Sequence, residues 1–427
     1  MKGFFVFSSV AVVVFILKLS ISTLGYNNDI EIWKHVSRGM LDGFLNGRVI
    51  YTYTQFYNHG PIRSYALYFL AFALNKLSLN DMYTFHIWVV FFLSIFDTIM
   101  ALLIWKIFGK VSSLIYLLNP VSLLITGYHS QIESTTIMIG LLSWFVLLKA
   151  KDLYEKKNPK YKKLLIASAI ILGFSLGIKH VLFFFPFYVF LMHRRNKIFK
   201  TSDIITYIFI PYFIFFGLFG IEILRDSYHP AAITFRNIKM FVFDYRSGGL
   251  YGTSGFAQLL HLFLPAAYIQ KYFSWTPFFK DYSFFFVTSL LLFGVLAINK
   301  VKDIKIVYPL YLLAMFAFSP SLANQYMAVP LLAMSVFYKN IIAFIYFLNT
   351  YIYLAAGPSA NISGLVRYQM NLLIGNIKVP FFPWSMSTQH QDKYSQVWAI
   401  LLAILLLYQM YYTPTRKQVV NIIKNYL

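Results

Sequence analysis

The sequence predicts an all-α bundle that crosses a membrane through about 11 to 13 apolar segments. Two observations support this prediction. Hydrophobic residues make up 59% of the chain and charged residues only 12%, whereas soluble domains carry about 25% charged residues. Apolar runs of membrane-spanning length also recur along nearly the whole chain. No soluble domain is expected.

The net charge of +22 comes from 37 Lys and Arg against 15 Asp and Glu. The positive-inside bias and contact with anionic headgroups explain this excess better than nucleic-acid binding does. Membrane lipids are therefore expected partners, and nucleic acid is not. The chain has no Cys, which excludes disulfides, thiolate metal sites and Cys nucleophiles.

The first apolar run, 4–24, is long enough for one crossing. It lacks a small-residue cleavage pattern, so we expect a retained signal anchor. Further apolar segments follow at 83–105, 111–128, 131–150, 164–179, 180–192, 204–222, 283–299, 306–321, 326–338, 340–356 and 395–412. Prolines are expected to break or bend several of them: Pro120, Pro186, Pro211, Pro309 and Pro330. Short, broken helices are tolerated in a membrane where protein or a cavity shelters their backbone.

The loop after the first crossing contains an amphipathic pattern. Apolar residues recur there at helical spacing: Ile30, Trp33, Val36, Met40 and Phe44. Charged residues lie between them, which predicts a helix at the membrane interface. Asn28 followed by Glu31 resembles a capping box and places the start of this helix near Asp29.

Four basic clusters predict the orientation of the bundle. They lie at 151–163, 193–200, 300–305 and 416–417. All four should be cytoplasmic, so the long loops 25–62, 223–282 and 357–394 fall on the opposite side. Residues 65–79 are apolar but short, and a full crossing there would invert this order, so we expect a partial or re-entrant segment.

Three polar stretches of the outer side are candidates for a site. They are 26–31, 57–61, and Asn119-Pro120 followed by 127–133. Each alone has a structural explanation: charges that complement a helix dipole, a turn, and an interfacial loop. Together they are more informative, because ionisable groups at membrane depth are costly and usually functional. We expect them to line one cleft.

Two further ionisable residues lie within apolar segments. Asp97 is in the middle of 83–105, where a buried carboxylate bonded to neighbouring helices is the favoured interpretation over a site residue. Lys179, followed by His180, lies at the junction of two short segments. It is either a cation placed to bind phosphate or a lysine that snorkels to the interface.

Several short motifs together resemble those of the C-type (GT-C fold) glycosyltransferases, in the mannosyltransferase-like branch. Asn119-Pro120 and the stretch 129–133 resemble its Asn-Pro and His-Gly-Gln-Phe-Asp signature. Gly177-Ile178-Lys179 with Pro186 resembles its lysine-containing hairpin, and 318–320 with Gln325-Tyr326 resembles a later Pro and Gln-Tyr segment. Ser130 replaces the usual Gly and Glu133 the usual Asp. The similarity covers most of a catalytic module at 1–340, and 341–427 is a variable C-terminal region.

This resemblance implies inverting transfer of a sugar, a hexose such as mannose, from a polyprenyl-phosphate donor on the extracytoplasmic face. The acceptor would be a lipid-linked glycan, a polysaccharide or a protein, and no cofactor or metal is required. Asp29 is the expected general base, with Glu31 as the fallback. The expected substrate-binding residues are Tyr57, Asn58, His59, His129, Gln131, Glu133, Lys179, Gln325 and Tyr326. The Lys-, Asn-, Phe- and Ile-rich composition favours a bacterial plasma membrane, or the endoplasmic reticulum if the source is eukaryotic.

Two other functions stay open at this point. A flippase or transporter of a lipid-linked glycan would show inverted repeats and charges at mid-membrane in matching halves, and the sequence shows neither clearly. A polymerase or ligase of lipid-linked glycans would use large outer loops with basic residues, which 223–282 provides.

Overall fold

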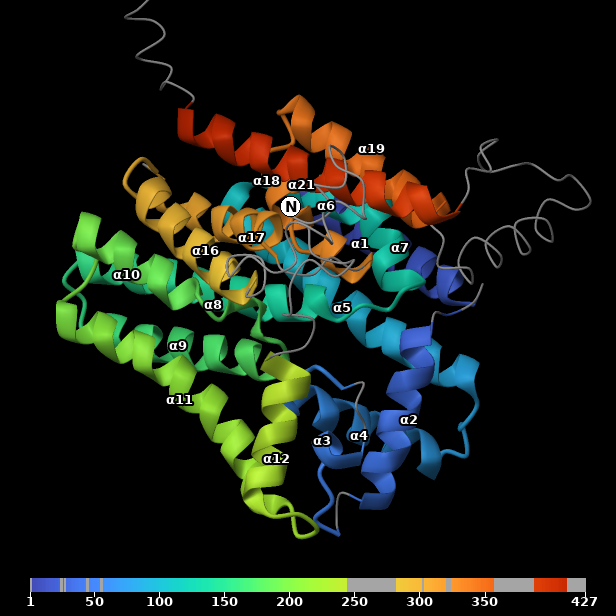
Figure 1. The fold of residues 1–427 in the computed structure, drawn as a ribbon. Coiled ribbons are helices and arrows are strands. Elements are labelled where there is room, and N and C mark those ends of the chain that lie inside the picture. Colours follow the sequence, from blue (N-terminus) through green and yellow to red (C-terminus); the bar gives the residue numbers. More distant parts are fainter. Residues whose placement is uncertain are drawn as a thin grey trace, which may run out of the picture.

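The computed structural model describes residues 2–23, 26, 28–43, 46–53, 57–243, 282–301, 303–319, 324–356 and 388–412, and every regular element among them is a helix. The α-helices are α1 (Lys2–Ser22), α2 (Asn28–Gly43), α3 (Ile50–Tyr53), α4 (Pro61–Lys76), α5 (Met82–Phe108), α6 (Lys110–Leu118), α7 (Pro120–Gly127), α8 (Glu133–Glu155), α9 (Tyr161–Ile178), α10 (Phe185–Asn196), α11 (Thr201–Arg225), α12 (Ala231–Ile238), α16 (Tyr282–Ile298), α17 (Val307–Ala317), α18 (Leu331–Val336), α19 (Ile341–Ala356) and α21 (Thr388–Tyr412) (Figure 1). Short 3-10 or π turns lie at His180–Leu182, Lys239–Phe243, Ile304–Ile306 and Asn324–Ala328.

Within the described residues, four helices are long and apolar enough to cross a membrane: α1, α5, α9 and α11. A fifth span is possible in the pair α6 and α7, whose axes are bent by 53° at Asn119-Pro120. Five shorter apolar helices lie in the described part of the second half of the chain. The structure thus confirms the predicted fold class, an α-helical membrane bundle. The number of 11 to 13 crossings stays a prediction. The helix α4, which covers the segment expected to be re-entrant, is not among these spans.

The prolines act mainly as helix starts. Pro120 and Pro186 lie in the first positions of α7 and α10, and Pro330 immediately precedes α18. A proline is tolerated in a first turn because the N–H that it lacks has no helical partner there. Pro211 is different: α11 continues through it, so of the predicted break or bend a break does not occur at this position.

Small side chains let the two central helices α8 and α9 pack closely. Ser143 of α8 and Ser168 of α9 each donate a hydrogen bond to the other's carbonyl oxygen, at 2.8 and 2.7 Å. Ser175 donates to the carbonyl of Thr136 at 2.8 Å. Membrane helices commonly associate in this way, because small residues permit close approach and hydroxyls bond across the interface.

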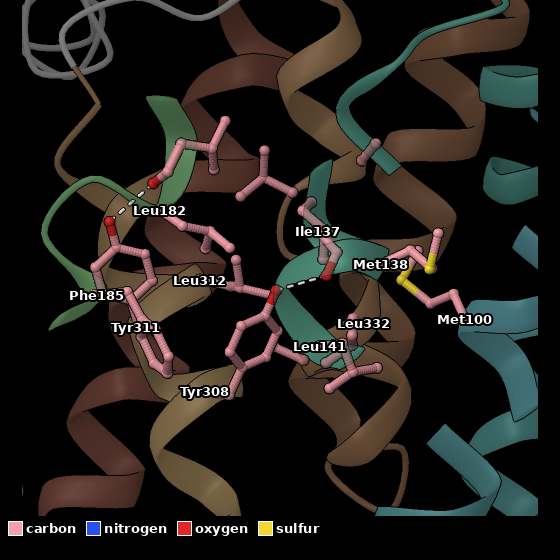
Figure 2. Close-up of a cluster of buried hydrophobic side chains, with 14 of the residues drawn as sticks. Met100, Ile137, Met138, Leu141, Leu182, Phe185, Tyr308, Tyr311, Leu312 and Leu332 are labelled. Carbon is pink, nitrogen blue, oxygen red and sulfur yellow. Dashed lines mark hydrogen bonds between the residues drawn. The ribbon is translucent and has the colours of Figure 1, made fainter. Parts of the chain in front are cut away.

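The second half of the chain is attached through buried tyrosines (Figure 2). Tyr308 and Tyr311 of α17 are fully buried among apolar side chains. The Tyr308 hydroxyl donates to the carbonyl of Ile137 at 2.6 Å, and that of Tyr311 to the carbonyl of Val181 at 2.8 Å. Each ring therefore buries its apolar area while its hydroxyl stays bonded, as buried tyrosine requires.

Three of the four basic clusters meet at one end of the bundle. Tyr154, within the first cluster, packs on Phe199 of the second with ring centroids 5.4 Å apart. Arg195 donates to the carbonyl of Val301 in the third at 2.6 Å. The fourth cluster, 416–417, lies outside the described residues. The helices α8 and α9 run from this basic end to Glu133 and Ile178 at the opposite end, where the polar stretches lie.

The predicted amphipathic helix is α2. Ile30, Trp33, Val36 and Met40 are buried, and α2 packs along α4. Figure 1 shows α2, α3, α4 and α12 gathered at one end of the view, away from α19 and α21.

Asp97 is held by a buried ion pair, which confirms the structural interpretation of this carboxylate. The ammonium of Lys18 in α1 lies 2.5 Å from Asp97 Oδ2, and both side chains are 1% exposed. Tyr116 of α6 donates to Oδ1 at 3.0 Å, and Thr126 of α7 donates to Oδ2. A single carboxylate thus connects α1, α5, α6 and α7.

Replacing Lys18 by Met should destabilise the protein by about 3–5 kcal/mol, because Asp97 would keep a buried charge without its cation. The double variant Lys18→Met/Asp97→Leu should recover most of this loss. Reversible SDS unfolding in mixed micelles measures both effects. The control is Lys151→Met, which removes a surface pair with Glu155 at 2.6 Å and should cost less than about 1 kcal/mol. Equal effects of Lys18→Met and the control would show that the buried pair does not hold these helices.

Candidate functional site

The polar stretches predicted to share a cleft are brought together by the ends of four helices. Asp29 is half-buried in the first turn of α2, and Gln131 is buried in the loop before α8. Gln131 Nε2 donates to Asp29 Oδ2 at 2.6 Å. This bond joins the first polar stretch to the third across 102 residues, and it fixes the orientation of the carboxylate.

A buried ion pair lies next to this contact. Lys179, which caps the end of α9, donates to Glu133 in the first turn of α8. Lys179 is 3% exposed and Glu133 is fully buried, so the lysine does not snorkel to the interface. The ammonium also lies 4.9 Å from the centre of the Tyr326 ring, a cation–π distance. Lys179, Glu133 and Tyr326, which are far apart in sequence, therefore form one cluster.

The second polar stretch approaches the same cluster through a close backbone contact. Gly60 N donates to the carbonyl of Ile178 at 2.8 Å, and a Cβ on Gly60 would collide with the carbonyl oxygen of Gly177. His59 is consequently buried beside Arg63 and Lys179. Burial, aided by these positive charges, holds the pKa of His59 well below its usual 6.5. Tyr57 donates to the carbonyl of Gly60 at 3.1 Å, which stabilises the turn.

Arg63 is a site residue that the sequence-based prediction missed. Its side chain is 1% exposed, and none of its three guanidinium nitrogens has a hydrogen-bond partner in the part of the chain that the structure describes. The guanidinium carbon lies 3.8 Å from the centre of the Trp33 ring. The negative charges of Asp29 and Glu133 attract the positive charge of Arg63. The signal in the sequence that could have indicated Arg63 is its position two residues after the polar turn at 57–61.

The remaining predicted residues are placed less centrally. Glu31 is exposed on α2, away from Gln131, although it is only two residues from Asp29. Asn58 is half-buried, and His129 is buried with its ring 5.5 Å from that of Tyr128. The side chain of Gln325 lies outside the described residues. Burial lowers the pKa of His129 to about 4, so this imidazole is neutral at pH 7.

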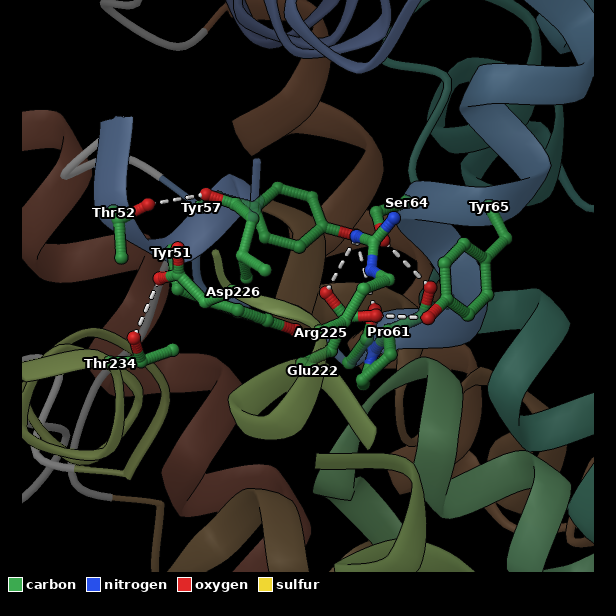
Figure 3. A network of polar contacts seen from close by, with 12 residues as sticks. Tyr51, Thr52, Tyr57, Pro61, Ser64, Tyr65, Glu222, Arg225, Asp226 and Thr234 are labelled. Carbon is green, nitrogen blue, oxygen red and sulfur yellow. Dashed lines mark hydrogen bonds and ion pairs between the residues drawn. The ribbon is translucent and has the colours of Figure 1, made fainter. Parts of the chain in front are cut away.

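A second polar network supports the outer wall of the site (Figure 3). Glu222, fully buried near the end of α11, accepts a hydrogen bond from Tyr65 of α4 and pairs with Arg225 at 3.1 Å. Asp226, the next residue, accepts a bond from Thr234 of α12 at 2.7 Å. These contacts attach α4 to α11 and α12, so they fix the helix that carries Arg63.

The site therefore combines a fixed carboxylate with buried cations. Asp29 can accept a proton, and Lys179 can stabilise negative charge that develops on a bound group. Within the described part of the chain, no group of three or more His, Asp or Glu side chains could hold a metal ion. No family model matches the chain, and no curated protein matches it.

The neutral His129 predicts a loss of stability in acid. The unfolded imidazole binds a proton below pH 6.5, whereas the folded one does so only near pH 4. Stability is therefore complete above pH 6.5 and falls as the pH is lowered toward 4. Between pH 7.5 and 5 this group should cost about 2 kcal/mol. SDS unfolding at both pH values should show a smaller acid loss in His129→Gln than in wild type.

His35→Gln is the matched control, because His35 is exposed on α2. It should keep the acid loss of the wild type. If His129→Gln and His35→Gln have the same pH dependence, His129 does not contribute the predicted effect.

Proposed function

We propose that this chain is an integral membrane glycosyltransferase that moves a sugar from a polyprenyl-phosphate donor to a lipid-linked glycan, polysaccharide or protein acceptor. The observation that carries the proposal is the meeting of Asp29, held by Gln131, with the buried Glu133–Lys179 pair at one end of the bundle. This end lies opposite the basic loops along α8 and α9. The positive-inside rule makes the basic end cytoplasmic and the site extracytoplasmic.

In the proposed reaction, Asp29 accepts the proton of an acceptor hydroxyl. The hydroxyl oxygen then forms a bond to the anomeric carbon of the donor sugar. The bond between that carbon and the phosphate oxygen breaks, and its electron pair leaves with the lipid phosphate. Attack from the side opposite the leaving group inverts the anomeric configuration. The proton stays on Asp29 until solvent or the product phosphate removes it.

Two features suit Asp29 to this role. It lies in the first turn of α2, where the helix dipole favours negative charge. The amide of Gln131 also holds one carboxylate oxygen, which reduces the reorganisation needed when the acceptor binds. A positioned general base contributes about 10²–10⁴-fold to a rate.

Lys179 supplies the positive charge for the leaving phosphate in this mechanism. Its burial strengthens electrostatic interactions, because the local dielectric is low. Glu133 and the Tyr326 ring hold the ammonium in place before the donor binds. Glu133 thus acts through Lys179 as a positioning residue, and His59 and Tyr57 form the wall beside them.

Asp29→Asn should lower transfer activity by about 10²–10⁴-fold at normal expression, because the amide cannot accept the proton. The assay uses purified protein in liposomes with a panel of polyprenyl-phosphate sugars carrying radiolabelled hexoses, and it measures both transfer and hydrolysis. Glu31→Gln is the control, since Glu31 is exposed two residues away, and it should keep near wild-type turnover. Wild-type turnover in Asp29→Asn contradicts the assignment of the base. Failure of the wild type on every donor contradicts the proposed function.

A further inference from the structure

An apolar groove of about 370 Å³ runs between α4 and α5, beneath Trp33 of α2. Its lining on α4 follows mainly one face of the helix from Arg63 through Leu70 to Leu74, and Leu77, at the C-cap of α4, continues it. From Arg63 to Leu77 this face is roughly 21 Å long by the helical rise. Opposite it, α5 provides Trp88, Val89, Phe92, Leu93 and Phe96. The groove is therefore long and lined mainly by apolar side chains.

The groove opens where the protein presents apolar side chains outward. Phe69 of α4 and Phe92 of α5 line it, and they are 65% and 44% exposed. In a membrane protein such surfaces contact lipid chains. The volume lies in the range of small-molecule pockets, and it is far below the volume of a helix about 10 Å across that would run the length of the groove. One hydrocarbon chain is the occupant that matches both the shape and the surroundings.

Two polar groups interrupt this lining at one end. Among the described residues, the three guanidinium nitrogens of the buried Arg63 and the buried hydroxyl of Thr135 in α8 have no hydrogen-bond partner. Both line the groove. A buried guanidinium without hydrogen bonds is costly. The nearby carboxylates of Asp29 and Glu133 act on its charge but make no hydrogen bond to it.

We propose that this groove binds an anionic phospholipid of the surrounding bilayer, with its phosphate on Arg63 and Thr135 and one acyl chain along α4 and α5. A phosphate oxygen accepts the guanidinium N–H bonds that the protein leaves unmade, and Arg is well suited to bidentate phosphate contacts. The acyl chain fills the groove and covers its apolar side chains. The lipid acts as a structural ligand that fixes α4 beside the site.

The groove is distinct from the reacting groups of the proposed function. Of the charged residues that surround the site, Arg63 alone lines it, and neither Asp29 nor Lys179 does. The inference therefore does not depend on sugar transfer, and it is tested by binding alone.

The experiment is native mass spectrometry of the full-length protein released from nanodiscs that contain equal amounts of dioleoyl phosphatidylglycerol and dioleoyl phosphatidylcholine. Wild type should retain one phosphatidylglycerol molecule, with at least about tenfold preference over phosphatidylcholine. Arg63→Gln should lose this preference, and Arg63→Lys should retain part of it. Retention of neither lipid, or of both equally, by the wild type overturns the proposal.

A second variant blocks the groove without touching Arg63, in case the Arg63 variants do not fold. Ala73 lines the groove at an exposed position, so Ala73→Phe fills it and should abolish retention of the lipid. The matched control is Gly217→Phe on α11, where an added Cβ meets nothing within 4 Å, and it should retain phosphatidylglycerol. Loss of the lipid in both variants, or in neither, contradicts the assignment to this groove.

Competition distinguishes the source of the phosphate. Undecaprenyl phosphate and inorganic phosphate are each added to the wild-type complex at tenfold excess over phosphatidylglycerol. The resident phospholipid should remain bound in both cases. Displacement of phosphatidylglycerol by undecaprenyl phosphate would assign the groove to a prenyl lipid, and displacement by inorganic phosphate would show a headgroup site without a chain; either result overturns the proposal.

Discussion

A buried cation in this bundle needs an anion, and the arrangement of the helices depends on how that requirement is met. No water is available in the hydrocarbon core, so an unpaired charge there is expensive. Lys18 meets the requirement with Asp97, which connects α1 to the broken pair α6 and α7. Lys179 meets it with Glu133, which brings the end of α9 to the start of α8. The same pair brings Gln131, two residues before Glu133, to Asp29.

Much of the fold could be predicted from the sequence, because hydrophobic periodicity is a local signal. Apolar runs marked most helices, and the start of α2 lies where Asn28 and Glu31 placed it. The partners of buried charges are not local. Asp97 could be recognised as a structural carboxylate, but nothing near it in sequence indicated Lys18, which is 79 residues away. Pro211 does not end α11, because membrane helices often accommodate a proline in their interior.

The candidate site was predictable to the level of stretches and not of side chains. A topology that placed three polar stretches on one face was enough to suggest that they meet. Which carboxylate faces inward depends on the rotation of α2: Asp29 and Glu31 are two residues apart and so about 200° apart around the helix. Burial of Ile30 and Trp33 against α4 sets that rotation and leaves Glu31 exposed. Arg63 was missed because its burial arises only when Trp33 covers it.

Lys179 and Arg63, two buried cations at this end of the bundle, differ in a way that separates their roles. Lys179 already has a carboxylate partner, so a phosphate that binds there competes with Glu133 and is held less tightly than its charge alone would allow. That suits a leaving group, which must depart after each turnover. Arg63 has no hydrogen-bonded partner among the described residues, so an anion that reaches it meets no such competition and stays. A retained ligand at Arg63 and an exchanging one at Lys179 follow from the same requirement that every buried charge be paired.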